Sequence, residues 1–68
     1  DTASGIRVLR HAVDVAPRDL EARYDLGLLC WRTGRTIEAR RVLEPLVAQA
    51  PGSEMAAQAR RILSGRAR

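Results

Sequence analysis

The 68-residue chain has little of what enzymes and disulfide-bonded domains are built from: it contains one His, one Cys, one Tyr, one Trp and no Lys. The single cysteine, Cys30, excludes a disulfide within the chain and a thiolate metal site, and it favours a reducing, cytoplasmic setting. No apolar stretch approaches the roughly 20 residues of a membrane span. Asp1 to Gly5 has neither the basic nor the apolar part of a secretory signal.

The few residues that could carry chemistry lack partners. His11 has Asp14 three residues further on but no nucleophile that would converge with it. Glu21 and Asp25 lie one helical turn apart, and two carboxylates on one helix without an acid–base partner do not make a glycosidase pair. We therefore expect no catalytic, cofactor-binding or metal-binding residue, and we expect that the protein is not an enzyme.

Arginine supplies all the positive side-chain charge. Twelve Arg stand against eight Asp and Glu, which gives a net charge of +4. The residues that could form a phosphate-contacting ridge are Arg7, Arg10, Arg40, Arg41, Arg60 and Arg61. Pairs such as Arg40 and Glu44 at helical spacing indicate a solvated, ion-paired face instead, and two aromatic residues offer little for stacking bases. The pattern disfavours nucleic acid as a partner.

Apolar residues recur at helical spacing through most of the chain, which predicts an all-α fold. The expected helices cover about residues 4–16, 20–33, 36–50 and 54–64. Asp19 and Ser53 are suited to cap the second and fourth helices, and Gly34 and Gly65 are suited to end them. The third helix is expected to turn Ile37, Leu43, Leu46 and Val47 toward the core. Pro45 lies inside it and should kink or loosen its middle.

The sequence repeats itself with a period of about 34 residues. Pro17 and Pro51 are separated by this period, which is called here the repeat offset. The further pairs at the repeat offset are Val8 with Val42, Leu9 with Leu43, Val13 with Val47 and Ala16 with Ala50. The helices that end before the two prolines therefore look like two copies of one element.

This spacing resembles the tetratricopeptide repeat, a helix-turn-helix unit. Between Leu20 and Ser53, the positions that match the family pattern are Leu26, Gly27, Gly34, Ala39, Leu43 and Pro51. The positions at which the family usually has aromatic residues hold Arg23, Cys30 and Leu43. The fold prediction is unaffected by these departures, but they put the shape of the groove in doubt.

The resemblance implies antiparallel helix-turn-helix repeats stacked as a short right-handed α-solenoid of about four helices. Residues 1–68 would form a single domain, with 4–17 as the second helix of a partial repeat, 20–53 as a full repeat and 54–65 as a capping helix. Gly27 and Ala39 are expected to face each other where two helices cross, with Leu26 and Leu43 interdigitating around them. Cys30 would face inward as an inert core thiol.

In this family, the first helix of each repeat lines a concave groove. The resemblance thus implies a non-catalytic protein–protein interaction module, within a larger protein, that binds a peptide or partner protein. The groove-facing residues would be Glu21, Tyr24, Leu28, Trp31 and Arg32. An alternative stays open for Tyr24 and Trp31, in which they pack against neighbouring helices. The paired Lys and Asn with which a subclass of the family binds C-terminal carboxylates are absent.

Self-association as a homodimer is the main alternative function. Apolar residues that could pair with a second copy are Ile6, Val8 and Val15 in the first helix, and Met55 and Ile62 in the last; a two-fold interface would cover them. The segment from Asp19 to Leu26 is also similar to the C-terminal repeat region of bacterial thioredoxin-like co-chaperones. That similarity is too short to indicate a partner.

Overall fold

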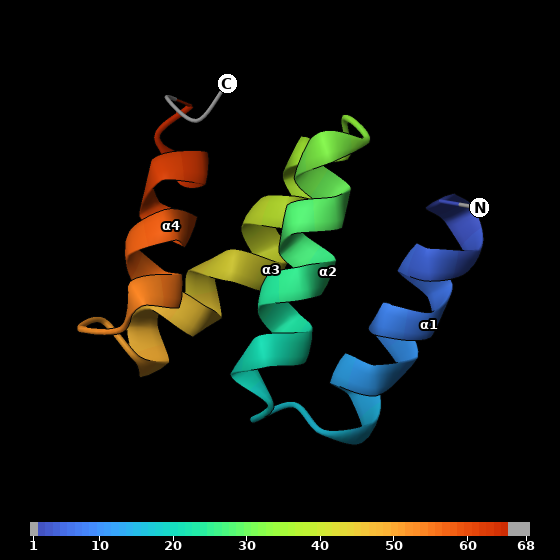
Figure 1. The fold of residues 1–68 in the computed structure, drawn as a ribbon, viewed down its shortest axis with the longest axis horizontal. Helices are drawn as coiled ribbons and strands as arrows, with labels where there is room; N and C mark the ends of the chain where they lie inside the picture. The colour runs from blue at the N-terminus through green and yellow to red at the C-terminus, as the bar shows by residue number, and fades with distance from the viewer. Residues whose placement is uncertain (1, 66–68) are drawn as a thin grey trace.

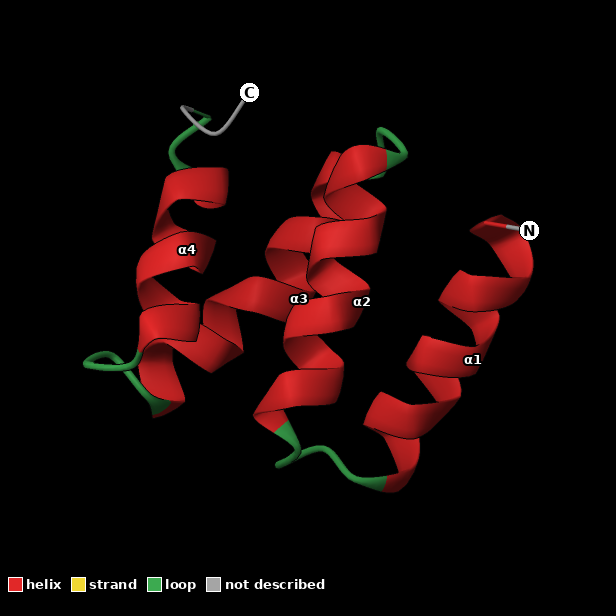
Figure 2. Cartoon of the chain, in the orientation of Figure 1, coloured by secondary structure: helices red, strands yellow, loops and turns green. Residues whose placement is uncertain are grey.

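The computed structural model describes residues 2–65, which form four helices (Figure 1). They are α1 (Thr2–Val15), α2 (Leu20–Arg32), α3 (Thr36–Gln49) and α4 (Glu54–Leu63). The described part of the chain contains no strand (Figure 2), so the all-α prediction is confirmed. Every helix end lies within two residues of the expected position. None of these helices is long and apolar enough to cross a membrane.

Side-chain caps begin α2 and α4 at the two positions predicted. The carboxylate of Asp19 accepts a hydrogen bond from the backbone amide of Ala22 at 3.2 Å. The hydroxyl of Ser53 accepts one from the amide of Ala56 at 3.0 Å. Each cap satisfies one of the amide groups that a helix start leaves without an internal partner. The two caps are separated by the repeat offset, and so are the two amides that they bind.

The turns that precede these caps are also built alike. The amide of Asp19 donates to the carbonyl of Ala16 at 2.9 Å, and the amide of Ser53 donates to the carbonyl of Ala50 at 3.0 Å. The period of the sequence is therefore a period of backbone geometry as well. The α1–α2 turn and the α3–α4 turn are two copies of one structural element.

Arginine side chains bind the carbonyls of the two repeated prolines. Arg23 donates to the carbonyl of Pro17 at 3.2 Å and, through its other terminal nitrogen, to that of Val42 at 3.4 Å. Arg60 donates to the carbonyl of Pro51 at 3.0 Å. Arg23 stands at a position where the family usually has an aromatic residue. It links the α1–α2 turn to the middle of α3, which is a connection that an aromatic ring could not make.

Helix α2 is the centre of the arrangement. It runs antiparallel to both α1 and α3, and α3 passes behind it in the view of Figure 1. Helix α2 contacts each of the other three helices. Gly34 reverses the chain between α2 and α3 with a φ of 83°, a left-handed conformation that glycine adopts without strain. The helices on either side of Gly34 thus form the expected antiparallel pair.

The core consists of two clusters that are joined through α2 and α3. One contains Ile6, Leu26, Cys30, Ala39 and Val42, and it joins α1, α2 and α3. The other contains Leu43, Leu46, Ala56, Ala59 and Ile62, and it joins α3 to α4. Each cluster needs side chains from more than one helical hairpin. The stack of neighbouring helices buries the core, as expected for a helical repeat.

Gly27 makes room for a large side chain, and this revises one expectation. A Cβ atom at Gly27 would lie 2.5 Å from Cγ of Leu43, which is fully buried. The three atoms nearest to that position all belong to Leu43, so a large side chain meets Gly27 directly, and Ala39 and Leu26 belong to the other cluster from Leu43. Leu43 occupies the space that the absent side chain leaves, so the close approach of α2 and α3 depends on a glycine at this position.

Helix α3 differs from the prediction at Ile37. This side chain is 71% exposed, although Leu43 and Leu46 are fully buried as expected and Val47 is half-buried. Ile37 precedes the buried Ala39 by two residues, and a separation of two residues places it on the opposite side of a helix. The helix continues through Pro45 to Gln49 without interruption.

Candidate functional site

The five residues predicted to line one groove follow one side of α2, but the structure divides them. Glu21 and Arg32 are exposed, whereas Tyr24, Leu28 and Trp31 are half-buried. Helix α2 stands between two surface hollows, one shared with α4 and one shared with α1. The predicted residues therefore lie on a helix that has a hollow on each side, and they do not line a single groove.

The hollow between α2 and α4, called here the α2–α4 hollow, has a volume of about 370 Å³. It is lined by Tyr24 from α2 and by Glu54, Met55 and Gln58 from α4. Tyr24 and Met55 also pack against the cluster that joins α3 and α4, and both side chains are half-buried. An aromatic ring and a thioether thus form an accessible apolar surface, with a carboxylate and an amide beside it.

The three α4 residues of this hollow were missed by the sequence analysis, although the repeat could have located them. They follow three residues of α2 at the repeat offset: Glu54 follows Leu20, Met55 follows Glu21 and Gln58 follows Tyr24. The hollow therefore lies between equivalent turns of two equivalent helices. Applying the repeat offset to Glu21 and Tyr24 would have identified Met55 and Gln58, whereas Glu54 corresponds to Leu20, which was not predicted to line the groove.

The hollow between α1 and α2, called here the α1–α2 hollow, has a volume of about 330 Å³. Its lining residues are Leu9, Asp25, Leu28, Leu29 and Arg32. Its surface is thus mainly aliphatic, with one acidic and one basic side chain. Leu28 and Arg32 from the predicted groove are placed here, away from Tyr24.

Trp31 has a structural role as well as a surface. It packs against both core clusters and is half-buried. Tyr24 packs against one cluster. The alternative in which the aromatic residues pack against neighbouring helices is therefore correct for part of each ring, and the remainder of each stays accessible.

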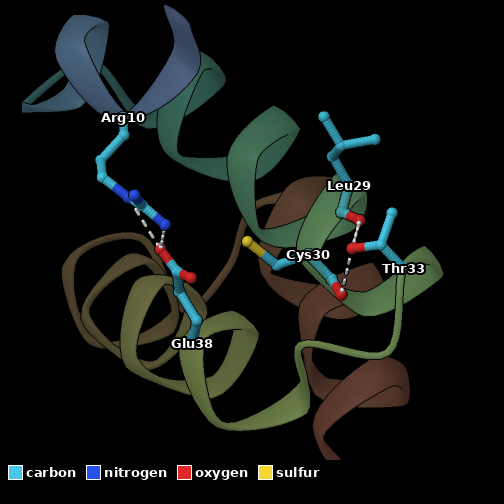
Figure 3. A network of polar contacts seen from close by, with 5 residues as sticks. All are labelled: Arg10, Leu29, Cys30, Thr33 and Glu38. Atoms are coloured by element: carbon cyan, nitrogen blue, oxygen red, sulfur yellow. Dashed lines mark hydrogen bonds and ion pairs between the residues drawn. The ribbon is translucent and has the colours of Figure 1, made fainter. Parts of the chain in front are cut away.

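A third and larger hollow, of about 550 Å³, lies on the α1–α3 side. An ion pair connects these two helices (Figure 3): Nε of Arg10 donates to a carboxylate oxygen of Glu38 at 2.9 Å, and Nη2 of Arg10 binds the same oxygen. Nη1 of Arg40 lies 3.8 Å from Oε2 of Glu44, and Nη2 of Arg40 donates to the carbonyl of Leu63 at 3.4 Å. Several arginines of the candidate ridge thus bind groups of the chain itself.

Cys30 is fully buried, as predicted, at the end of α2. Burial raises the pKa of its thiol, and the nearby carboxylate of Glu38 adds to this rise. The thiol is therefore neutral at neutral pH, the opposite of a reactive cysteine. The carbonyl of Cys30 accepts a hydrogen bond from the Thr33 hydroxyl at 3.2 Å (Figure 3). It accepts a second one from the Arg35 amide at 2.8 Å. Its surroundings serve packing and the helix end.

The other candidates for chemistry stay apart. His11 is exposed on α1. Residues 2–65 include no group of three or more His, Cys, Asp or Glu side chains that could hold a metal ion. The surface features that the fold brings together are the hollows beside α2.

Stacked antiparallel helix pairs with a regular period define a helical-repeat protein. The model of the tetratricopeptide repeat family matches residues 1–64, and the chain belongs to this family. Repeats of this family generally serve as protein–protein interaction modules. No curated protein and no solved structure gives a significant match to the chain.

Proposed function

We propose that the protein is a non-catalytic binding module that holds a peptide segment of a partner protein on the side of α2 that faces α4. The observation that carries this proposal is the α2–α4 hollow, where Tyr24 and Met55 form an accessible apolar surface next to Glu54 and Gln58. Apolar and aromatic surface with a few polar groups at its edge is typical of binding sites. Tyrosine is also enriched among residues that dominate binding energy.

The proposed surface extends beyond this hollow. Leu28 and Arg32 continue it along α2 into the α1–α2 hollow. An extended segment that crosses α2 would reach both hollows. The proposed contact residues are therefore the five predicted ones, Glu21, Tyr24, Leu28, Trp31 and Arg32, together with Glu54, Met55 and Gln58.

We further propose the division of the chain that the resemblance implies, with a partial repeat over 4–17, a full repeat over 20–53 and a capping helix over 54–65. The repeat offset supports the last part. Leu26, Gly27 and Cys30 are buried on α2, and the equivalent residues are Arg60, Arg61 and Ser64. All three are exposed. Solenoids need terminal elements with a polar outer face, and these residues give α4 such a face.

Self-association is supported less well. Ile6 and Ile62 are buried, so their expected place in a dimer surface is wrong. The exposed apolar residues that remain on α1 are Val8 and Val15, which are 68% and 70% exposed. Two valine side chains supply a small part of the roughly 800 Å² that each partner of a standard interface buries. The free thiol of Cys30 supports a reducing, cytoplasmic setting, which stays a prediction.

Selection from a displayed library of random peptides tests the proposed function. We expect peptides to be enriched, and we expect their affinity to fall about tenfold or more in Tyr24→Ala and Met55→Ala. Ile37→Ala is the matched control, because Ile37 is exposed but lines the hollow on the α1–α3 side. Circular dichroism would verify that each variant is folded.

Two results would contradict the proposal. One is that the enriched peptides bind all three variants as tightly as the parent protein. The other is sedimentation of a concentration-dependent dimer that Val8→Asp disrupts, with no peptide bound on α2, since this result would favour self-association.

A further inference from the structure

We infer that the α2–α4 hollow receives the side chain of an arginine or lysine in the partner segment. This inference rests on the proposed function and names the chemistry of its ligand. It is carried by a carboxylate without an ion pair in an apolar hollow that no arginine of residues 2–65 lines.

One carboxylate lines the hollow, and a second lies on the helix that supplies Tyr24. Glu54 lines the hollow, and Glu21 is exposed on α2, three residues before Tyr24 and thus on a neighbouring part of the same helix surface. Neither of them forms an ion pair with any residue in 2–65. Asp14, Asp19 and Asp25 likewise form no ion pair within these residues, so what distinguishes Glu54 is its place in the lining of the hollow.

Helix electrostatics explain only part of this pattern. Glu21 and Glu54 lie in the first turns of α2 and α4, where negative charge is favourable. Glu38 occupies the same kind of position in α3, but it is bound by Arg10. A position in the first turn of a helix therefore explains why these residues are acidic. It does not explain why Glu21 and Glu54 have no arginine partner.

Three of the four arginines of the two helices are directed elsewhere, and the fourth, Arg61, is exposed and does not line the hollow. Arg23 of α2 binds the carbonyls of Pro17 and Val42, and Arg60 of α4 binds the carbonyl of Pro51. Arg32 lines the α1–α2 hollow. Among residues 2–65, the lining of the α2–α4 hollow includes no cationic side chain. A cation from a partner would meet no like charge in it.

The apolar part of the hollow suits the rest of a basic side chain. The stems of arginine and lysine pack along apolar surface while the charged end stays in contact with polar groups or water. Met55 offers such a surface, and the ring of Tyr24 attracts a cation placed over its face. Glu54 and Glu21 would then neutralise the charged end, and the amide oxygen of Gln58 could accept a hydrogen bond from it.

Other side chains fit the same hollow less well. A carboxylate would meet charges of its own sign. A purely apolar side chain would cover carboxylates without giving them a hydrogen-bond partner, which is unfavourable. The combination of Tyr24, Met55 and Glu54 therefore selects for a long cationic side chain.

The test uses peptides enriched from the random library on the full chain. We expect these peptides to contain an Arg or Lys whose replacement by Gln weakens binding about tenfold or more. Added salt should weaken the binding of the basic peptide, because the contact is partly exposed. Glu54→Gln and Glu21→Gln should each reduce affinity several-fold. Glu44→Gln is the matched control, since Glu44 is an exposed glutamate on α3, and it should leave affinity unchanged.

Charge reversal gives the sharpest comparison. In Glu54→Arg, the preference should change from the basic peptide to a version with Glu in place of its Arg or Lys. Peptides that depend on Tyr24 but carry no essential basic residue, or that bind Glu54→Gln and Glu54→Arg unchanged, would overturn this inference and leave the proposed function intact. If no enriched peptide depends on Tyr24 or Met55, the proposed function and the inference both fail.

Discussion

Replacing Gly27 with alanine should destabilise the protein, although alanine is the better helix former. The new Cβ atom would lie 2.5 Å from Cγ and 3.1 Å from Cδ1 of Leu43. Leu43 is fully buried, and close-packed protein interiors leave little room for such a side chain to move. Overpacking of this kind costs about 1–3 kcal/mol, whereas the gain in helix propensity from glycine to alanine is up to about 1 kcal/mol. Where the full gain in helix propensity is realised, the expected net loss is up to about 2 kcal/mol.

Gly5→Ala is the matched control, because Gly5 is also a glycine inside a helix. Its Cβ atom would lie 3.4 Å from Cδ2 of Leu29, which is an ordinary contact distance. This substitution should stabilise the protein by about 0.5–1 kcal/mol through helix propensity alone. The two glycine-to-alanine changes are therefore expected to have opposite signs.

Urea unfolding measures both effects, with circular dichroism and Trp31 fluorescence as two probes of one transition. For a domain of this size, about 1 kcal/mol corresponds to about 4–8 °C in Tm. A double-mutant cycle makes the test specific. Leu43→Ala alone should cost about 2–5 kcal/mol, and adding Gly27→Ala should cost less than it does in the parent, with a coupling of about 0.5–3 kcal/mol. A Gly27→Ala variant as stable as the parent, or an additive cycle, would refute the packing of Leu43 against Gly27.

Two further predictions concern the helix caps and the buried thiol. Asp19→Ala and Ser53→Ala should each lower the free energy of unfolding by about 1 kcal/mol. The control Asp25→Ala, at an exposed site within α2, should change it little. If either cap variant is as stable as the parent, the two turns are not equivalent. Because burial raises the pKa of Cys30 above its ordinary value of 9.0, the unfolded thiol loses its proton before the folded one. The contribution of Cys30 to stability is therefore complete below this value and declines as the pH rises through it. As the pH rises above about 9, the parent should lose more stability than Cys30→Ala, and equal losses would show that the thiol is not protected.

The helices could be predicted from the sequence because their signals are local. Asp19, Ser53, Gly34 and Gly65 act within a few residues of their own positions, and the structure confirms each of them. The repeat offset then indicates the order and pairing of the helices. Family membership over residues 1–64 confirms that interpretation.

What the sequence could not show depends on which side chain fills which space. Ile37 has an apolar side chain of the kind found in cores. The buried side of α3 is the one that carries Ala39 and Leu43, however, and Ile37 lies on the opposite side. Likewise, a small residue at Gly27 indicates close packing without telling whether Ala39 or Leu43 takes the space. The division of the predicted groove residues between two hollows depends on how α1 and α4 lie beside α2, and no local pattern in the sequence records that placement.

Helix α2 contacts every other helix and also carries exposed residues. Residues that hold the fold together and residues that are open to solvent therefore stand side by side on one segment of the chain. Its buried residues, Leu26, Gly27 and Cys30, are committed to packing, so changes there would disturb the whole fold. Glu21, Asp25 and Arg32 stand in solvent and are free to vary at little cost in stability. Related chains could therefore acquire different partners by exchanging these few exposed side chains while the scaffold beneath them stays the same.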